Sequence, residues 1–170
     1  KVSTDEYIHS DSFEIIMCCV RDVHGEFHTI DGAQGVEHMR NRLLELGAEQ
    51  YPVLAHNMRF DGAILAWRLG IVPPLYLDTM LMARAKLRHE TGSSSLRSVA
   101  EYFHLNAKGT TVSDMLGVHR ADMDIVSFAG YEDYCRNDVA ITYNAFILLE
   151  GGYPRKQVMA IDRLIRMYTQ

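Results

Sequence analysis

The chain has few cysteines for its 170 residues, and they are arranged neither as zinc ligands nor as a disulfide framework. Cys18 and Cys19 are adjacent in a segment predicted to be a strand, so they face opposite sides of it, and Cys135 stands alone. A small secreted protein held together by disulfides is therefore excluded. We interpret all three cysteines as reduced thiols and expect a cytoplasmic location.

Long hydrophobic runs and an excess of basic residues are also missing. No apolar segment approaches the roughly 20 residues that a membrane-spanning helix needs, and no signal peptide is visible, so no membrane partner is expected. The formal net charge of −5 argues against a general basic coat for nucleic acid. It does not exclude a local basic groove, and clustered carboxylates that hold metal ions would shift the balance in the same direction.

The chain also lacks an initiator methionine and a clear end. It begins at Lys1, and Gln170 ends a helical pattern without a stop signal. We therefore expect a piece of a longer polypeptide. A length of 170 residues with 48% hydrophobic content fits one domain with a sizeable core.

The first half of the chain predicts a hairpin followed by alternating helices and strands. The nearly continuous apolar run from Phe13 to Val20 predicts a buried strand, and a turn leads into a second strand from Glu26 to Ile30. The segments expected next are a helix at 36–46, a strand at 51–55, a helix at 60–69 and a strand at 75–77. This order predicts an α/β domain with a mixed sheet.

The second half is predicted to be mainly helical. Asp78 precedes a helix and is interpreted as its N-cap, and the polar stretch from His89 to Ser95 predicts a flexible loop. The segments expected after it are a short helix at 96–103, an irregular stretch at 106–117, a long helix at 131–150 and a last helix opened by Pro154.

Asp138 is the most unusual residue of the long predicted helix. Helical spacing puts it in the middle of the apolar face, whereas Arg136 and Asn137 fall on the far side. An ionised carboxylate against a core costs on the order of several kcal/mol unless it is paired or bound to a metal. Tyr134 lies one turn earlier on the same face, so both side chains can point into one site. This pairing favours chemistry over packing.

A second informative stretch runs from Leu54 to Asp61. It puts His56 and Asn57 at the carboxyl end of a strand, where α/β sheets gather their ligands, and Asp61 in the first turn of the next helix. Asp61 and Asp138 can then converge on one cleft. Mg²⁺ prefers oxygen ligands and keeps several waters, and two such ions about 4 Å apart can support phosphodiester cleavage.

These two stretches resemble a known family. The patterns His56-Asn57-x-x-Phe60-Asp61 and Tyr134-x-x-x-Asp138 resemble the second and third motifs of DEDDy 3′–5′ exonucleases. The likeness is greatest to the proofreading domain of bacteriophage-type family A DNA polymerases. It covers nearly the whole chain, and its longer segments are residues 55–69, 77–85, 134–142 and 161–169.

The resemblance implies a fold and a chemistry. The fold would be ribonuclease H-like, a mixed sheet flanked by helices, in an exonuclease domain at residues 1–152, with residues 153–170 forming a helix that leads toward a polymerase domain. Asp61 and Asp138 would bind metal in a site for two Mg²⁺ ions, with Mn²⁺ as an alternative. Tyr134 would orient the attacking water. The location would be the host cytoplasm for a phage-encoded protein.

The resemblance also implies how the substrate is held. Asn57 and Phe60 would lie close to the terminal nucleotides of a single-stranded DNA 3′ end. His56 would support the end of the β-strand that precedes them. Lys108 is a further candidate for strand binding. It and the basic residues that flank the polar loop, Arg84, Lys86, Arg88 and His89, fit a solvated face as well as a basic lip beside a cleft.

One part of the family pattern is missing. The family has an Asp-x-Glu pair on its first, central strand, and neither Asp5-Glu6 nor the pair Asp11 and Glu14 has that spacing. We expect the pair to lie upstream of Lys1. The chain would then lack the central strand and two metal ligands, and in isolation it would be inactive.

Other interpretations stay open at two levels. The alternative functions are a ribonuclease D-like RNA exonuclease and a non-catalytic structural or strand-binding domain of the same fold, and the missing pair favours the second of these. For single residues the structural alternatives are an arginine ion pair for Asp138, the positive end of a helix for Asp61, core packing for Tyr134 and Phe60, and helix capping for Asn57.

Overall fold

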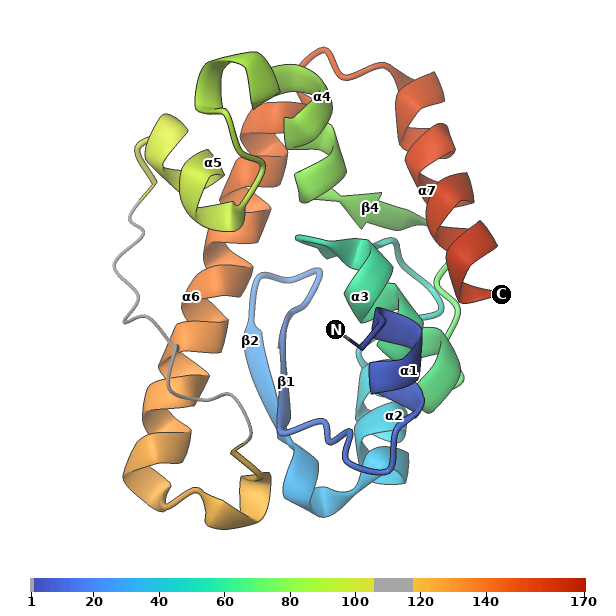
Figure 1. Ribbon diagram of the computed structural model, residues 1–170, viewed down its shortest axis with the longest axis vertical. Coiled ribbons are helices and arrows are strands. Elements are labelled where there is room, and N and C mark those ends of the chain that lie inside the picture. The colour runs from blue at the N-terminus through green and yellow to red at the C-terminus, as the bar shows by residue number, and fades with distance from the viewer. Residues whose placement is uncertain (1, 106–117) are drawn as a thin grey trace.

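The computed structural model describes residues 2–105 and 118–170, and these residues form a mixed α/β structure (Figure 1). The helices and strands are α1 (Thr4–His9), β1 (Met17–Arg21), β2 (Phe27–Asp31), α2 (Val36–Glu45), β3 (Val53–Ala55), α3 (Met58–Ala63), β4 (Tyr76–Asp78), α4 (Thr79–Thr91), α5 (Leu96–Tyr102), α6 (Ile125–Glu150) and α7 (Arg155–Thr169). Within these ranges, no helix combines the length and the apolar character needed to cross a membrane.

The strands form two separate pairs. β1 and β2 are antiparallel, with Met17 opposite Asp31, whereas β3 and β4 are parallel, with Val53 opposite Tyr76. Among the described residues, no backbone hydrogen bond joins the two pairs, so β1 and β3 each keep one edge without a strand partner. The predicted α/β class is confirmed, but the described strands make two pieces rather than one mixed sheet.

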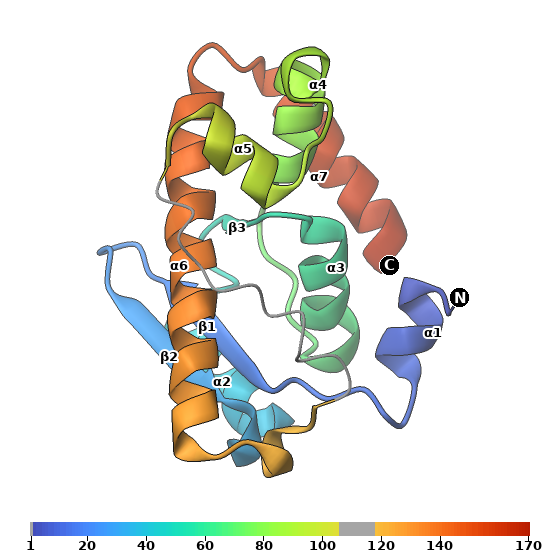
Figure 2. The same ribbon diagram turned by 60° about the vertical axis from the view of Figure 1, so that its left-hand side comes forward.

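Two long helices flank these strands. α6 packs against β1 and β3 along part of its length and against α4 and α5 along the rest, and α7 packs against α3 and β4 (Figures 1 and 2). Asp162 of α7 is buried and accepts a hydrogen bond from the backbone N–H of Tyr76 at 2.9 Å. The indole N–H of Trp67 donates to the carbonyl of Thr169 at 2.9 Å. α7 is thereby tied to the strand and helix that it covers.

α6 is longer than predicted and is capped at both ends. It begins at Ile125 instead of Tyr131, because the side chain of Asp124 accepts a hydrogen bond from the N–H of Ser127 at 2.7 Å. At the other end, Lys86 donates to the carbonyls of Leu149 and Gly151, both at 2.8 Å. The ammonium of Lys86 is thus engaged with the C-terminus of α6.

Two further boundaries differ from the predicted ones, and one helix was not predicted. β1 begins at Met17 and not at Phe13, because Phe13 turns into a small core cluster with Ile8 and Ala63. Ile8 belongs to α1, a helix that the sequence analysis missed although a capping box of Ser3 and Glu6 marks its start. α4 extends into the predicted loop and ends at Thr91. Gly92 follows as its C-cap, with a φ of 65° that suits glycine.

Candidate functional site

The carboxylate of Asp78 holds the beginnings of two helices at the carboxyl end of β4. Its side chain is fully buried. It accepts hydrogen bonds from the N–H groups of Met80 at 2.8 Å and Leu81 at 3.2 Å in α4, as predicted for an N-cap. It also accepts from the N–H groups of Asn57 at 3.3 Å and Met58 at 3.0 Å, where α3 begins. Burial raises the pKa of Asp78, and these donors oppose that shift.

His56 connects the end of β3 to two neighbouring segments. Its Nδ1 lies 2.9 Å from the hydroxyl of Thr79, and its Nε2 lies 3.0 Å from the carbonyl of Ser94. A carbonyl only accepts, so Nε2 carries a proton, and burial lowers the pKa of His56, which favours the neutral ring. The hydroxyl of Thr79 then donates to Nδ1. Both ring nitrogens are engaged in holding the strand end in place.

Asp61 lies in the first turn of α3. Its side chain is partly buried, and this burial raises the pKa of Asp61 to about 7, to which the negative charge of Asp78 contributes. Its own backbone N–H is the group that stabilises the carboxylate. Within residues 2–105 and 118–170, no basic side chain forms an ion pair with it. Asp61 is therefore a carboxylate that its own fold leaves without a charge partner.

Asp138 and Tyr134 face each other on α6. Burial raises the pKa of Asp138, and a hydrogen bond from the Tyr134 hydroxyl lowers it. The pKa of Tyr134 rises to about 12 because of burial and of the neighbouring carboxylate, so the phenol stays protonated at neutral pH. The ring of Tyr134 stacks on that of Tyr131, with centroids 6.4 Å apart and planes at 9°.

The described part of the chain supplies no arginine to Asp138. Arg136, which was predicted to lie on the far side of the helix, reaches the hairpin. Its Nε donates to Thr29 at 3.1 Å and to Glu132 at 2.9 Å. Residues two positions apart on a helix point in nearly opposite directions, so Arg136 lies on the other side of α6 from Asp138, and the β1–β2 hairpin covers that side.

Asp61 and Asp138 lie on helices to either side of β1 (Figures 1 and 2). The charge of Asp61 acts on Cys18 in β1, and that of Asp138 acts on Cys135 in α6. Among the described residues, no three or more His, Cys, Asp or Glu side chains form a group able to hold a metal ion. Asp61 therefore lies near Cys18 of β1 and Asp138 lies near Cys135 of its own helix, and the two carboxylates do not form a metal site by themselves.

The predicted substrate-binding residues have different surroundings. Asn57 is exposed at the start of α3 with a φ of 78°, and its side chain does not cap the helix, because the carboxylate of Asp78 takes that place. Phe60 is partly buried and packs against the cluster of Ile8 and Phe13. Lys108 lies outside the described residues.

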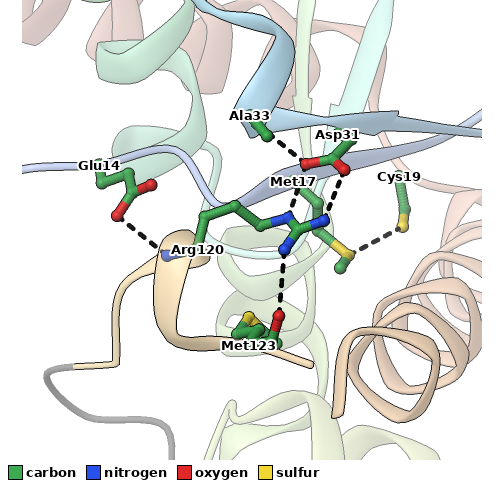
Figure 3. Close-up of polar contacts among 7 residues, drawn as sticks. All are labelled: Glu14, Met17, Cys19, Asp31, Ala33, Arg120 and Met123. Carbon is green, nitrogen blue, oxygen red and sulfur yellow. Dashed lines mark hydrogen bonds and ion pairs between the residues drawn. The ribbon is translucent and has the colours of Figure 1, made fainter. Parts of the chain in front are cut away.

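A polar cluster that the sequence analysis missed anchors the segment before α6 (Figure 3). The guanidinium of Arg120 donates to both carboxylate oxygens of Asp31, each at 2.7 Å, and to the carbonyl of Met123 at 3.4 Å. The backbone N–H of Arg120 donates to Glu14 at 3.1 Å. The Arg120 guanidinium lowers the pKa of Asp31. This cluster ties the beginning of α6 to the ends of the hairpin strands.

No protein-family model, curated protein or solved structure matches the chain. Its function must therefore be inferred from its residues and their geometry.

Proposed function

We propose that this chain is part of a 3′–5′ exonuclease that proofreads for a DNA polymerase, hydrolysing the terminal phosphodiester of a single-stranded DNA 3′ end. The observation that carries the proposal is the pair Asp61 and Asp138. Both are partly buried carboxylates with raised pKa values, and no described basic residue neutralises either of them. Carboxylates in that condition are typical of sites that bind a cation.

The donor set fits Mg²⁺, with Mn²⁺ as an alternative. Mg²⁺ takes oxygen ligands and commonly uses one or two carboxylates together with water and substrate phosphate. Asp61 and Asp138 would hold it, and when bound it would stabilise negative charge on the attacking and leaving oxygens. A second ion needs further carboxylates, which we assign to an Asp-x-Glu pair on a strand outside the chain.

Tyr134 has a separate role in this proposal. Its hydroxyl remains protonated at neutral pH and lies close enough to Asp138 for each group to shift the pKa of the other. A protonated phenol can donate to one oxygen while accepting from a water molecule, so it can orient that water toward a phosphate without taking its proton. Asn57, exposed at the start of α3, and Lys108 would contact the single strand. His56, with both ring nitrogens engaged in hydrogen bonds, would act by fixing the end of β3 next to Asn57.

The divided sheet supports the same proposal. β1 and β3 each have an edge without a strand partner among the described residues. One additional strand between these edges would unite the two pairs into the mixed sheet of a ribonuclease H-like fold. Because alternate residues of a strand face the same side, an Asp-x-Glu pair on it would present both carboxylates together. The polymerase domain would follow α7, and the protein would act in the cytoplasm of the host cell.

One observation favours a second candidate, a non-catalytic strand-binding domain with this fold. The described residues contain no group of three or more metal-binding side chains. An RNA exonuclease resembling ribonuclease D is a third candidate with the same chemistry. The sequence upstream of Lys1 separates the first two, because the enzymatic proposal requires an Asp-x-Glu pair on an apolar strand there.

Activity is tested in a polypeptide that carries this chain together with its upstream and downstream segments. We expect Asp138→Ala to abolish Mg²⁺-dependent trimming of 5′-labelled single-stranded DNA while polymerisation continues. The matched control is Asp133→Ala, which removes an exposed carboxylate from the same helix and should leave trimming unchanged. Trimming by Asp138→Ala at a rate near that of the unaltered protein would refute the metal-binding role. Trimming of RNA in preference to DNA would favour the ribonuclease candidate.

A further inference from the structure

Two thiols that are far apart in sequence meet between β1 and α6. Cys19 lies in β1, and Cys135 lies in α6, which packs on that strand. Arg136, which follows Cys135 in α6, donates to Thr29, the cross-strand partner of Cys19, at 3.1 Å, and each of the two thiols shifts the pKa of the other. All three cysteines of the chain are free, and Cys18 points away from this contact into the core cluster that contains Ile30. Cys19 and Cys135 are both partly buried, and neither belongs to the fully buried core.

Polar groups surround the sulfur of Cys19. Thr29 is its cross-strand partner, and the Thr29 hydroxyl lies 3.7 Å from the Cys19 Sγ. The guanidinium of Arg136 donates to the same hydroxyl at 3.1 Å. On the other side, the Sδ of Met17 lies 3.9 Å from the Cys19 Sγ (Figure 3). The thiol of Cys19 is thus placed beside one sulfhydryl donor, one hydroxyl donor and one nearby cation.

These neighbours give the two thiols different chemical roles. The thiol of Cys135 lowers the pKa of Cys19 most, and Thr29 and the charge of Arg136 add to it, against the effects of burial and of Glu132. The pKa of Cys135 is raised by the thiol of Cys19 and by burial, so it keeps its proton. A thiolate is the nucleophile in thiol oxidation. Cys19 is therefore the thiol that attacks the oxidant, and Cys135 is the thiol that then attacks the oxidised Cys19.

We propose that Cys19 and Cys135 are an oxidation site that forms a reversible intramolecular disulfide when the protein meets hydrogen peroxide. The Cys19 thiolate attacks one peroxide oxygen, which gives a sulfenic acid, while the other oxygen leaves as hydroxide and takes up a proton to become water. The sulfur of Cys135 then attacks the sulfur of Cys19, loses its proton and releases the sulfenic oxygen as a second water. Two thiols are oxidised, and one peroxide is reduced to two waters.

The third cysteine, Cys18, is not expected to take part in this disulfide. Cys18 is next to Cys19 in sequence, but burial raises the pKa of Cys18 to about 12, so its thiol carries little nucleophilic thiolate. Chain proximity alone would make Cys18 and Cys19 equivalent partners for Cys135. The structure distinguishes them by strand alternation, since one faces the core cluster and the other faces α6.

The test is peroxide treatment of the folded 170-residue chain, followed by alkylation under denaturing conditions and mass spectrometry. Before alkylation, we expect the intact monomer to be lighter by about 2 Da, which is the mass of two hydrogens. After alkylation, it should carry one alkyl group where the untreated chain carries three. Fragment ions should show an alkylated Cys18 and a bond between Cys19 and Cys135. Dithiothreitol should restore three alkylatable thiols.

Three variants provide the controls. Cys18→Ser should form the disulfide as the unaltered chain does, whereas Cys19→Ser and Cys135→Ser should not form an intramolecular one. A bond that includes Cys18, disulfide-linked dimers alone, or three thiols that stay alkylatable after peroxide would each overturn the proposal. The fragment ions of the unaltered chain decide the outcome even where a variant fails to fold. None of these readouts depends on nuclease activity.

Discussion

Two regions of the molecule treat a carboxylate in opposite ways. At the junction of β4, α3 and α4, the fully buried Asp78 accepts hydrogen bonds from four backbone N–H groups. In the region between α3 and α6, Asp61 and Asp138 are partly buried and have no ion-pair partner among the described residues. A carboxylate that accepts from four backbone donors belongs to the architecture, whereas a partly buried carboxylate with a single donor and no described cation is maintained for another purpose.

The largest effect on stability is expected at Asp78, the carboxylate that holds the starts of two helices. Asp78→Ala should lower the free energy of unfolding by about 3–5 kcal/mol, because it leaves buried N–H groups without an acceptor at two helix starts. Urea unfolding followed by circular dichroism measures it. The control is Asp124→Ala, an exposed N-cap of one helix, which should cost about 1 kcal/mol. Equal losses in the two variants would show that Asp78 caps only α4.

A smaller effect of opposite sign is expected at Asp61. Because the pKa of Asp61 is raised in the folded chain, its folded form binds a proton more tightly than its unfolded form. Its ionisation therefore destabilises the fold as pH rises from about 4 through 7. Asp61→Asn should gain about 1–2 kcal/mol of stability over the unaltered chain at pH 8 and little at pH 4.

Unfolding curves at the two pH values measure this difference. Asp133→Asn, on the exposed surface of α6, is the matched control and should show no such pH dependence. If Asp61→Asn destabilised the fold at pH 8, the Asp61 carboxylate would have a structural partner, and the contrast with Asp78 would disappear.

The smallest expected effect is at Tyr134. Tyr134→Phe keeps the ring that stacks on Tyr131 and removes only the hydroxyl that reaches Asp138. We expect a change in unfolding free energy of less than about 1 kcal/mol. In the complete polypeptide, 3′ trimming should fall at least tenfold. Tyr143→Phe, on the exposed face of α6, should change neither quantity. A large loss of stability with unchanged trimming would assign Tyr134 to packing.

Local signals in the sequence predicted much of this structure. The apolar run, the turn and the glycine and aspartate caps predicted the hairpin, the end of α2 and the start of α4. The second function of Asp78 was not predictable, because the N–H of Met58 reaches it only after β3 and β4 pair. The Arg120–Asp31 contact joins residues 89 positions apart and has no local signature.

In the candidate site, the sequence predicted neighbours on one helix but not contacts between elements. Helical spacing correctly put Tyr134 and Asp138 within reach of each other. Spacing did not predict the contact of Arg136 with Thr29, since it describes one helix and not the hairpin that covers it. The contact between Cys19 and Cys135 also needed the packing of α6 on β1.

The two-helix role of Asp78 has a consequence for the order of folding. The contact from Met58 to Asp78 spans 20 residues, whereas the contact from Arg120 to Asp31 spans 89. Closing the shorter loop costs less chain entropy, so the unit from β3 to α4 can collect its native contacts before the ends of α6 are anchored. The carboxylate of Asp78 would then serve as an early nucleus on which the longer-range parts of the chain assemble.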